Sequence, residues 1–464
     1  MAPKRLTPND AVFLFGESRD TMMHVAGLLP FSPAEDAPPD FLRRLVDDIK
    51  ASRDVQPPFN QKLWTPEWLK NPVQAWVEDR DLDIDYHVRR SALPAPGDER
   101  ELGVLVSRLH SHPVDFHKPP WEVHLIEGLE GGRFALYCKV HHSLVDGFTA
   151  MRILKRTLSA SPEDRDQPMF FAVPPTHRAR EADELEPPPA DVFEVLRHQL
   201  RVVKDMGSSL LDALQAGFKK DGSFEQPLRA PQCILNGRIS RNRRFATQQL
   251  ELERLKVVAK TAGCTLNDVV LALSAGSLRR FLLEMNALPD APLIAMLPVN
   301  ARPKDDPGGG NAVGTILASL ATHVADPAAR LAEIVASTRR AKAELQGLST
   351  NAIIQLSMLM MAPFALQMVT GTIGRLRPAF NVVISNVPGP ERPLYFRGAR
   401  LEASYPMSIP VHGLALNITC QSYAGTLNFG FIGCRDTLPH MQHLAVYCGE
   451  ALTELEIALG CKGS

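Results

Sequence analysis

The sequence predicts a mixed α/β fold built as two domains. The chain has 464 residues, about three times the length of a typical single domain. Strand-like patterns alternate with helical ones on both sides of residues 161–190, which are dense in proline and charge and have no sustained hydrophobic period. We therefore expect an N-terminal domain at 1–160, a proline-rich linker with a connecting helix at 161–225, and a C-terminal domain at 226–464.

Before the linker, the clearest element is a β-hairpin. The apolar-rich segments WEVHLIEGL and RFALYCKVHH are joined by a glycine-rich turn at Gly128–Gly132. A helical pattern follows at Thr149–Leu158. Within the linker region, Asp191–Lys220 has apolar residues at helical spacing, which predicts one long amphipathic helix.

After the linker, strand and helix patterns alternate again. Strands are expected at 243–251, 293–299, 314–323, 380–387, 414–423 and 426–432, and helices at 252–262, 267–285, 327–345, 351–369 and 438–459.

Composition limits the classes of function. The chain carries 51 Lys and Arg against 52 Asp and Glu, so no overall field favours nucleic acid. Seven cysteines, odd in number and never in CxxC, indicate reduced thiols and neither a disulfide framework nor a zinc site. The apolar run at Ala11–Phe15 is too short for a signal peptide. We expect a cytoplasmic protein.

One uncharged stretch, between Glu344 and Arg375, is long enough to cross a bilayer. Polar residues dilute it, and Pro363 interrupts it. We therefore expect a buried helix pair whose clustered methionines suit an adaptable apolar cavity.

The segment with the clearest chemical signature is HHSLVDG, His141–Gly147, at the end of the predicted hairpin. Alternation along the strand places His142 on the apolar face with Phe134, Leu136, Cys138 and Val140, and His141 on the other face. His142 is then either a packed core residue or a desolvated, neutral imidazole able to act as a general base. Asp146 and Gly147 follow in a strand-to-helix turn.

Other chemistries fit this segment less well. A metal site would need His141, His142 and Asp146 together with neighbouring histidines, but adjacent strand residues point to opposite faces, and no HExxH motif is present. The chain has no GxSxG nucleophile elbow and no glycine-rich phosphate loop.

HHSLVDG resembles the HHxxxDG signature of CoA-dependent acyltransferases. With LTPNDAVFLFGES, PPWEVHLIEGL, LNDVVLALSAGSLRRFL, LPVNARP and NVVISNVPGPERPLYFRGARL in order, the chain is most similar to the bacterial wax ester synthase/diacylglycerol acyltransferase family. One departure is Pro120, where that family usually has leucine.

The resemblance implies two chloramphenicol-acetyltransferase-like domains with mixed sheets and an active-site tunnel at their interface. It also implies that His142 is the general base, and that Asp146 forms an ion pair with Arg302 that bridges the domains. His141 and Gly147 would support the motif. Asn267 is the candidate donor to the oxyanion; alternatively, it is a plain N-cap of its helix. Neither a metal nor a cofactor is required beyond acyl-CoA as co-substrate.

The implied function is transfer of a long-chain acyl group from acyl-CoA to a fatty alcohol, giving a wax ester, or to diacylglycerol, giving triacylglycerol. Peripheral contact with a membrane or lipid droplet is compatible with such substrates. Two alternatives stay open: a condensation-type acyltransferase with another acceptor, and a non-catalytic lipid-binding protein of the same fold.

Overall fold

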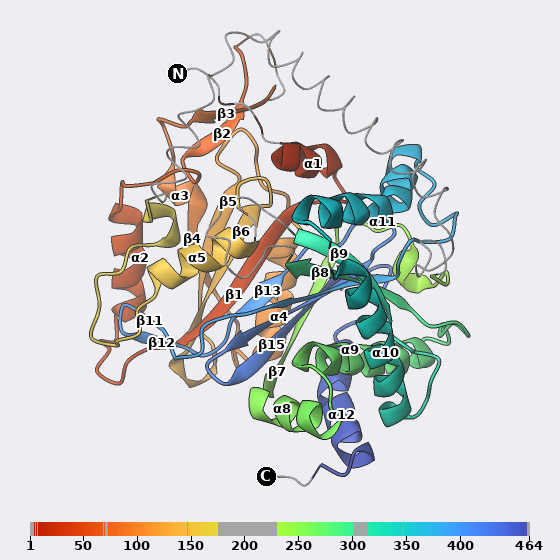
Figure 1. The fold of residues 1–464 in the computed structure, drawn as a ribbon. Helices are drawn as coiled ribbons and strands as arrows, with labels where there is room; N and C mark the ends of the chain where they lie inside the picture. Colours follow the sequence, from red (N-terminus) through yellow and green to blue (C-terminus); the bar gives the residue numbers. More distant parts are fainter. Residues whose placement is uncertain are drawn as a thin grey trace. The chain divides into compact units, whose positions relative to one another are not determined.

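The computed structural model describes residues 4, 6, 8–67, 69, 73–145, 147–174, 230–300, 313–346 and 348–461. The chain divides into two compact units (Figure 1). Unit 1 consists of Met1–Asp205 and Gly389–Ile409, and unit 2 of Met206–Pro388 and Pro410–Ser464. The helix expected at Asp191–Lys220 lies outside the described residues.

Unit 1 is a mixed α/β unit built on one large sheet. The strand order is β11-β12-β1-β6-β5-β4, with β13 also paired to β1. Only β4 and β5 run parallel among these pairs. The elements are α1 (Pro8–Gly16), β1 (His24–Ser32), α2 (Phe41–Ala51), β2 (Gln61–Trp64), β3 (Val73–Glu78), α3 (Ile84–His87), β4 (Val88–Ala92), α4 (Glu99–His110), β5 (Trp121–Glu127), β6 (Phe134–His141), α5 (Gly147–Thr157), β11 (Tyr395–Phe396), β12 (Ala399–Leu401) and β13 (Tyr405–Met407).

The central strand β6 is covered on both faces. On one face, Lys139 Nζ donates to the carbonyl oxygens of Leu109 and His112 at the end of α4, over 3.2 and 3.0 Å. On the other, Trp121 of β5 stacks on Phe171 of the 3₁₀ helix η2 (Phe170–Ala172), which contacts α5. The face covered by α4 is fully buried from Ala135 to His141, so polar side chains on that face need partners within the protein.

The division into domains differs from the sequence-based expectation at one segment. The C-terminal domain was expected to be continuous over 226–464, but β12 and β13 pair with β1 of unit 1. Their backbone hydrogen bonds occupy the edge of β1 opposite to β6, so residues 389–409 belong to unit 1. The boundaries expected at 160 and 225 stay a prediction.

Unit 2 holds a second mixed sheet, with the strand order β7-β15-β14-β10-β8-β9. Here β10 runs parallel to both β14 and β8, and the other pairs are antiparallel. The elements are β7 (Arg243–Glu251), α8 (Leu252–Thr261), α9 (Leu266–Glu284), β8 (Ile294–Asn300), β9 (Val313–Ser319), α10 (Pro327–Leu345), α11 (Thr350–Thr370), β10 (Val382–Val387), β14 (Leu416–Tyr423), β15 (Thr426–Cys434) and α12 (His443–Ala458).

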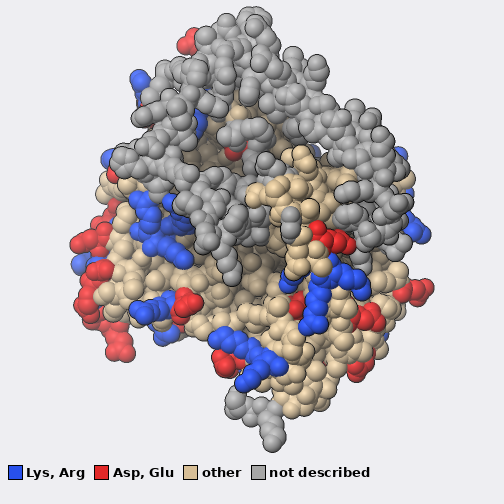
Figure 2. Space-filling model, viewed as in Figure 1, with Lys and Arg blue, Asp and Glu red and all other residues tan. Residues whose placement is uncertain are grey.

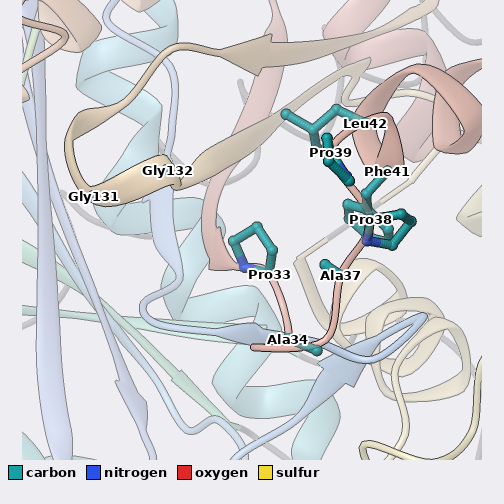
Figure 3. Close-up of a pocket in the computed structure, with 9 residues that line it drawn as sticks. All are labelled: Pro33, Ala34, Ala37, Pro38, Pro39, Phe41, Leu42, Gly131 and Gly132. Carbon is teal, nitrogen blue, oxygen red and sulfur yellow. The ribbon is translucent and has the colours of Figure 1, made fainter.

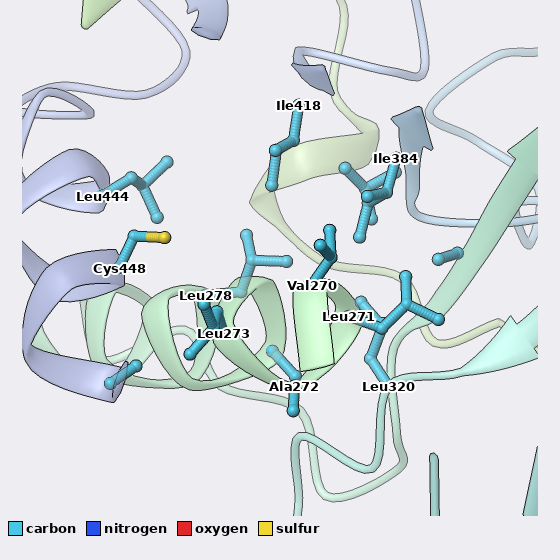
Figure 4. Close-up of a cluster of buried hydrophobic side chains, with 14 of the residues drawn as sticks. Val270, Leu271, Ala272, Leu273, Leu278, Leu320, Ile384, Ile418, Leu444 and Cys448 are labelled. Atoms are coloured by element: carbon cyan, nitrogen blue, oxygen red, sulfur yellow. The ribbon is translucent and has the colours of Figure 1, made fainter. Parts of the chain in front are cut away.

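The core of unit 2 forms around α9, which is buried on nearly all sides between Asp268 and Leu278. Figure 4 shows its side chains Val270, Leu271 and Leu273 among residues from the sheet and from α12. A helix with apolar residues all round its circumference is stable only when other elements enclose it. Helices α8, α10 and α12 pack against α9 and provide that enclosure.

The uncharged stretch forms one continuous helix, α11, which passes through Pro363. The prediction of a buried helix pair is therefore wrong. The stretch forms a single helix, and two of its residues, Met358 and Leu366, are exposed. Within the described residues, no single helix has the length and apolar character needed to cross a membrane. The bent pair α8 and α9 meets those criteria together, and most of α9 is buried in the core of unit 2.

A buried ion pair connects the two strands of the central hairpin. Lys139 lies directly across from Glu122, with Nζ 3.2 Å from Oε2, and its side chain is fully buried. His124 Nε2 lies 3.4 Å from the same oxygen. Burial would raise the pKa of Glu122, but the contacts with His124, Lys139 and Arg89 outweigh it and hold the pKa at about 2.

We expect Glu122→Gln to lower the free energy of unfolding by about 3–5 kcal/mol at pH 7, because Lys139 would be left buried without its carboxylate. In the native protein, the folded pKa of about 2 lies below the ordinary value of 4.5. This contribution to stability should thus be present above pH 4.5 and lost as pH falls towards 2.

Urea denaturation across this pH range measures both effects. Asp36→Asn, which removes the exposed ion pair with Arg165, is the control and should cost less than about 1 kcal/mol. Equal losses in the two variants would contradict a special role for the buried pair.

Candidate active site

The HHSLVDG segment forms the predicted strand-to-helix turn in unit 1. Strand β6 ends at His141, residues 142–144 turn, and α5 begins at Gly147. The His141 N–H donates to the carbonyl oxygen of Pro120, over 2.9 Å. Proline retains this acceptor, so the departure at Pro120 leaves the backbone contact intact.

His141 is fully buried and its ring is held from several sides. Its Nδ1 lies 2.6 Å from Ser143 Oγ, and its Nε2 lies 3.4 Å from Glu17 Oε2. Phe116 packs edge-on against the ring. The His141 ring is therefore enclosed by these three side chains.

His142 has a different environment. It follows the last residue of β6, is only partly buried, and stacks its imidazole on the Phe13 ring at a centroid distance of 4.1 Å and an angle of 12°. Its backbone N–H donates to the Met23 carbonyl oxygen, over 2.9 Å, just before β1 begins. The ring stacking and the backbone contact therefore hold His142 in one orientation, and the residue is less completely buried than His141.

Sequence patterns alone did not identify Glu17, which connects these contacts. One carboxylate oxygen, Oε2, accepts a hydrogen bond from the Met23 N–H and also faces His141. The peptide of Met23 thus lies between Glu17 and the backbone of His142. The only sequence signal is the position of Glu17 just after the apolar run of α1, more than a hundred residues before the motif.

Asn267 lies at the start of α9 in unit 2, but it is not the N-cap. Thr265 is the N-cap, and it forms a capping box with Asp268. The N-cap alternative for Asn267 is therefore wrong, because the first amides of the helix already have these partners. The Asn267 side chain is partly exposed and makes no hydrogen bond with the described part of the chain.

Two of the predicted site residues, Asp146 and Arg302, lie outside the described residues. Two of the neighbouring histidines of the metal alternative have other partners: His110 Nδ1 lies 2.8 Å from Tyr137 OH, and His124 contacts Glu122. Among the residues described, no group of three His, Cys, Asp or Glu side chains could hold a metal ion.

A pocket of about 330 Å³ lies elsewhere in unit 1 (Figure 3). Its lining is proline-rich and contains no titratable side chain: Pro33, Ala34, Ala37, Pro38, Pro39, Phe41, Leu42, Gly131 and Gly132. Acyl transfer needs a group that moves a proton, so this pocket is not the reaction site.

Comparison with known families identifies the chain. Residues 6–270 match the wax ester synthase/diacylglycerol acyltransferase catalytic domain, and residues 309–456 match the WS/DGAT C-terminal domain. The chain belongs to this family. The acyltransferase class and the family expected from HHSLVDG are therefore confirmed.

Relatives match over nearly the whole chain. A Mycobacterium tuberculosis protein named "Putative diacylglycerol O-acyltransferase" is 52% identical over 99% of this chain and 98% of its own length. The O-acyltransferase WSD of Acinetobacter baylyi is 39% identical over 97% of this chain and 96% of its own.

Solved structures confirm the fold. The wax ester synthase/diacylglycerol acyltransferase of Marinobacter aquaeolei VT8 superimposes with a TM-score of 0.80 at 40% identity, covering 98% of this chain and 100% of that one. The first condensation domain of the CDA synthetase matches at 0.53 and 17% identity, over 100% and 97% of the two chains. At that identity, the second match supports the α/β fold alone.

We expect Glu17→Gln to lower kcat roughly tenfold, because a charge-assisted contact of about 1.5–3 kcal/mol near the motif is lost and the turn loosens. KM should change little, because the substitution removes no group that we expect to touch substrate. Steady-state kinetics and melting temperature measure these effects.

The matched control is Glu35→Gln, an exposed position in the same unit. If both variants kept native kcat, Glu17 would have no role in positioning the histidines.

Proposed function

We propose that the protein transfers a long-chain acyl group from acyl-CoA to a fatty alcohol or to diacylglycerol, with His142 as the general base. The observation that carries this proposal is the position of the partly buried His142, whose imidazole stacks on Phe13 and whose backbone is held next to β1. The names of the relatives point to the same classes of acceptor.

The chemistry balances without a covalent enzyme intermediate. His142 removes the hydroxyl proton as the alcohol oxygen attacks the thioester carbonyl carbon. The tetrahedral intermediate then collapses, the C–S bond breaks, and the imidazolium returns its proton to the CoA thiolate. The products are an oxygen ester and free CoA, and the base is regenerated without a metal or further cofactor.

Five further residues would support the reaction. The Asn267 amide, which lacks a hydrogen-bond partner among the described side chains and backbone, would donate to the oxyanion. His141 and Gly147 would shape the turn. Asp146 and Arg302 would form an ion pair with a structural role.

Long acyl chains need a dry cavity, because each buried methylene contributes about 0.8 kcal/mol and excluded water protects the thioester. We propose that α11, which carries no charged side chain, supplies part of its wall. The tunnel expected between the two domains remains a prediction, as does peripheral contact with a membrane or lipid droplet.

We expect His142→Ala to lower turnover by about 10²–10⁴, the usual contribution of a positioned general base. The matched variant His141→Ala should lower it less at equal folded fraction, because the His141 ring is enclosed. Release of free thiol from palmitoyl-CoA, measured with hexadecanol, with dipalmitoylglycerol and without acceptor, follows the reaction.

Three outcomes would overturn the proposal. Equal losses in both variants at equal circular dichroism would remove the assignment of the base. Binding of palmitoyl-CoA without thiol release in the native protein would favour a lipid-binding protein. Thiol release only with an amine acceptor would favour the condensation-type alternative.

The Asp146–Arg302 pair is tested by a double-mutant cycle. Asp146→Asn and Arg302→Met should each lower the melting temperature together with activity, because each change strands the opposite charge. The double variant should lose less than the sum of the two. Additive losses would contradict the pairing.

A further inference from the structure

The first helix, α1, places an aromatic ring flat against the imidazole of His142. The Phe13 and His142 rings are nearly parallel, with 4.1 Å between their centroids and an angle of 12° between their planes. The other histidine of the motif meets its aromatic neighbour differently, because the Phe116 ring lies edge-on to His141, at 77°. The π-face of Phe13 is therefore directed at the proposed base.

Contacts other than the ring pair hold α1 in place beside the motif. Ala11 and Leu14 of α1 lie in a small buried cluster, and Leu144 of the motif packs against this cluster. Just after the helix, the Glu17 carboxylate faces the first histidine of the motif. Because α1 is attached in these two ways, a change at Phe13 alters the ring contact and leaves the helix anchored.

The proposed reaction gives His142 a positive charge for part of each cycle. The imidazole is neutral before it removes the hydroxyl proton, and it is an imidazolium until it returns that proton to the thiolate. An aromatic ring attracts a cation that lies over its face within about 6 Å of the ring centroid, and the His142 ring is within this range. This attraction grows as the charge develops, so it would stabilise the transition state more than the ground state.

The charge on the protein surface does not replace this local contact. The whole chain has a net charge of −1, and on the described part of the face that Figure 2 draws, Lys and Arg side chains are interspersed with Asp and Glu. Exposed charges of both signs, mixed in this way, are largely screened at a distance. A group that touches the His142 ring therefore has more influence on its charged form than the surface has.

Stacking alone does not indicate a role in the reaction. His87 also stacks on an aromatic ring, that of Trp121, at 4.3 Å and 19°. His87 is fully buried, however, and burial lowers its pKa, so this contact packs a neutral ring. His142 is only partly buried, and its proposed role requires it to take up a proton.

The Phe13 ring has two opposite effects on a charged His142. It removes water from one face of the imidazole, which disfavours the cation, whereas its π-face attracts the cation. Because His142 is only partly buried, the rest of its surface retains some hydration, and we expect the attraction to be the larger effect. Attractions of this kind correspond to about a twofold to thirtyfold change in rate.

We propose that Phe13 is a positioning residue for acyl transfer, which holds the His142 imidazole in one plane and stabilises its imidazolium form through the π-face. The inference rests on the proposed function, because it requires His142 to act as the base. Phe13 itself needs to touch neither the acyl group nor the acceptor. A change at Phe13 should therefore alter kcat and leave KM unchanged.

The test weakens the π-face while the ring keeps its shape. Phenylalanine with one, two or three ring fluorines is incorporated in place of Phe13, because each fluorine withdraws electron density from the face and changes the size of the ring little. With palmitoyl-CoA and hexadecanol, kcat should fall stepwise with the number of fluorines, by about threefold to tenfold with three. KM and the melting temperature should stay at their native values.

Two natural substitutions separate the π-face from simple coverage of the imidazole. Phe13→Leu covers the ring without a π-face and should lower kcat by about twofold to thirtyfold, whereas Phe13→Tyr retains the face and should keep kcat within about twofold of native. The matched control is Phe15 of the same helix, whose side chain is 43% exposed. Phe15→Leu and the fluorinated residues at that position should leave kcat unchanged.

Three results would overturn the role of Phe13: a kcat that none of the fluorinated residues changes, equal losses of kcat at Phe13 and Phe15, or a change confined to KM, which would assign the ring to substrate contact. His142→Ala separates these failures from a failure of the proposed function. If His142→Ala retained native turnover, the assignment of the base would itself fail. If it lost turnover while the fluorinated residues at Phe13 kept native kcat, only the role of Phe13 would fail.

Discussion

The antiparallel pairing of β6 with β1 is the constraint on which the candidate site depends. Its register runs from Phe31 opposite Phe134 to His24 opposite His141, and the bond from His142 N–H to Met23 O extends it by one residue. A slip of one residue would exchange the two faces of the strand. The fixed register therefore decides which histidine is fully buried and which is only partly buried.

Burial of the face of β6 that α4 covers explains why each polar side chain on that face has a specific partner. Tyr137, Lys139 and His141 each meet a specific partner, respectively His110, Glu122 and Glu17. A partly satisfied network in a low-dielectric interior would be costly, whereas a satisfied one specifies a single arrangement. The same contacts attach α4 and the end of α1 to the strand that carries the motif.

The sequence predicts the long periodic elements well and the short ones poorly. The expected strand 243–251 and helix 327–345 coincide with β7 and α10, since each has a strong period and clear ends. Strands β11–β13 have two or three residues each. Strands β12 and β13 depend on pairing with β1, far away in the chain, and β11 pairs with β12. Helix α11 continues through Pro363 although proline usually marks a break.

The sequence predicts those site residues that lie together in one short motif. A contiguous motif gives His141, His142 and Gly147, and strand alternation separates the two histidines. Phe13 and Glu17 reach the motif only through tertiary structure, so no spacing rule in one sequence reveals them. Thr265 is the N-cap of α9, in a capping box with Asp268. The Asp268 side chain also accepts a hydrogen bond from Thr338 of α10. No local sequence pattern predicts this contact between two helices.

The late return of residues 389–409 to the first sheet has a consequence for synthesis on the ribosome. When β1 and β6 emerge, the edge of β1 that β12 and β13 will occupy is still unpaired, and most of the second unit must be made before it is filled. An open strand edge is a template for association between chains. A fragment ending before residue 389 would retain that open edge. We therefore expect the nascent protein to depend on chaperones until residues 389–409 have been translated.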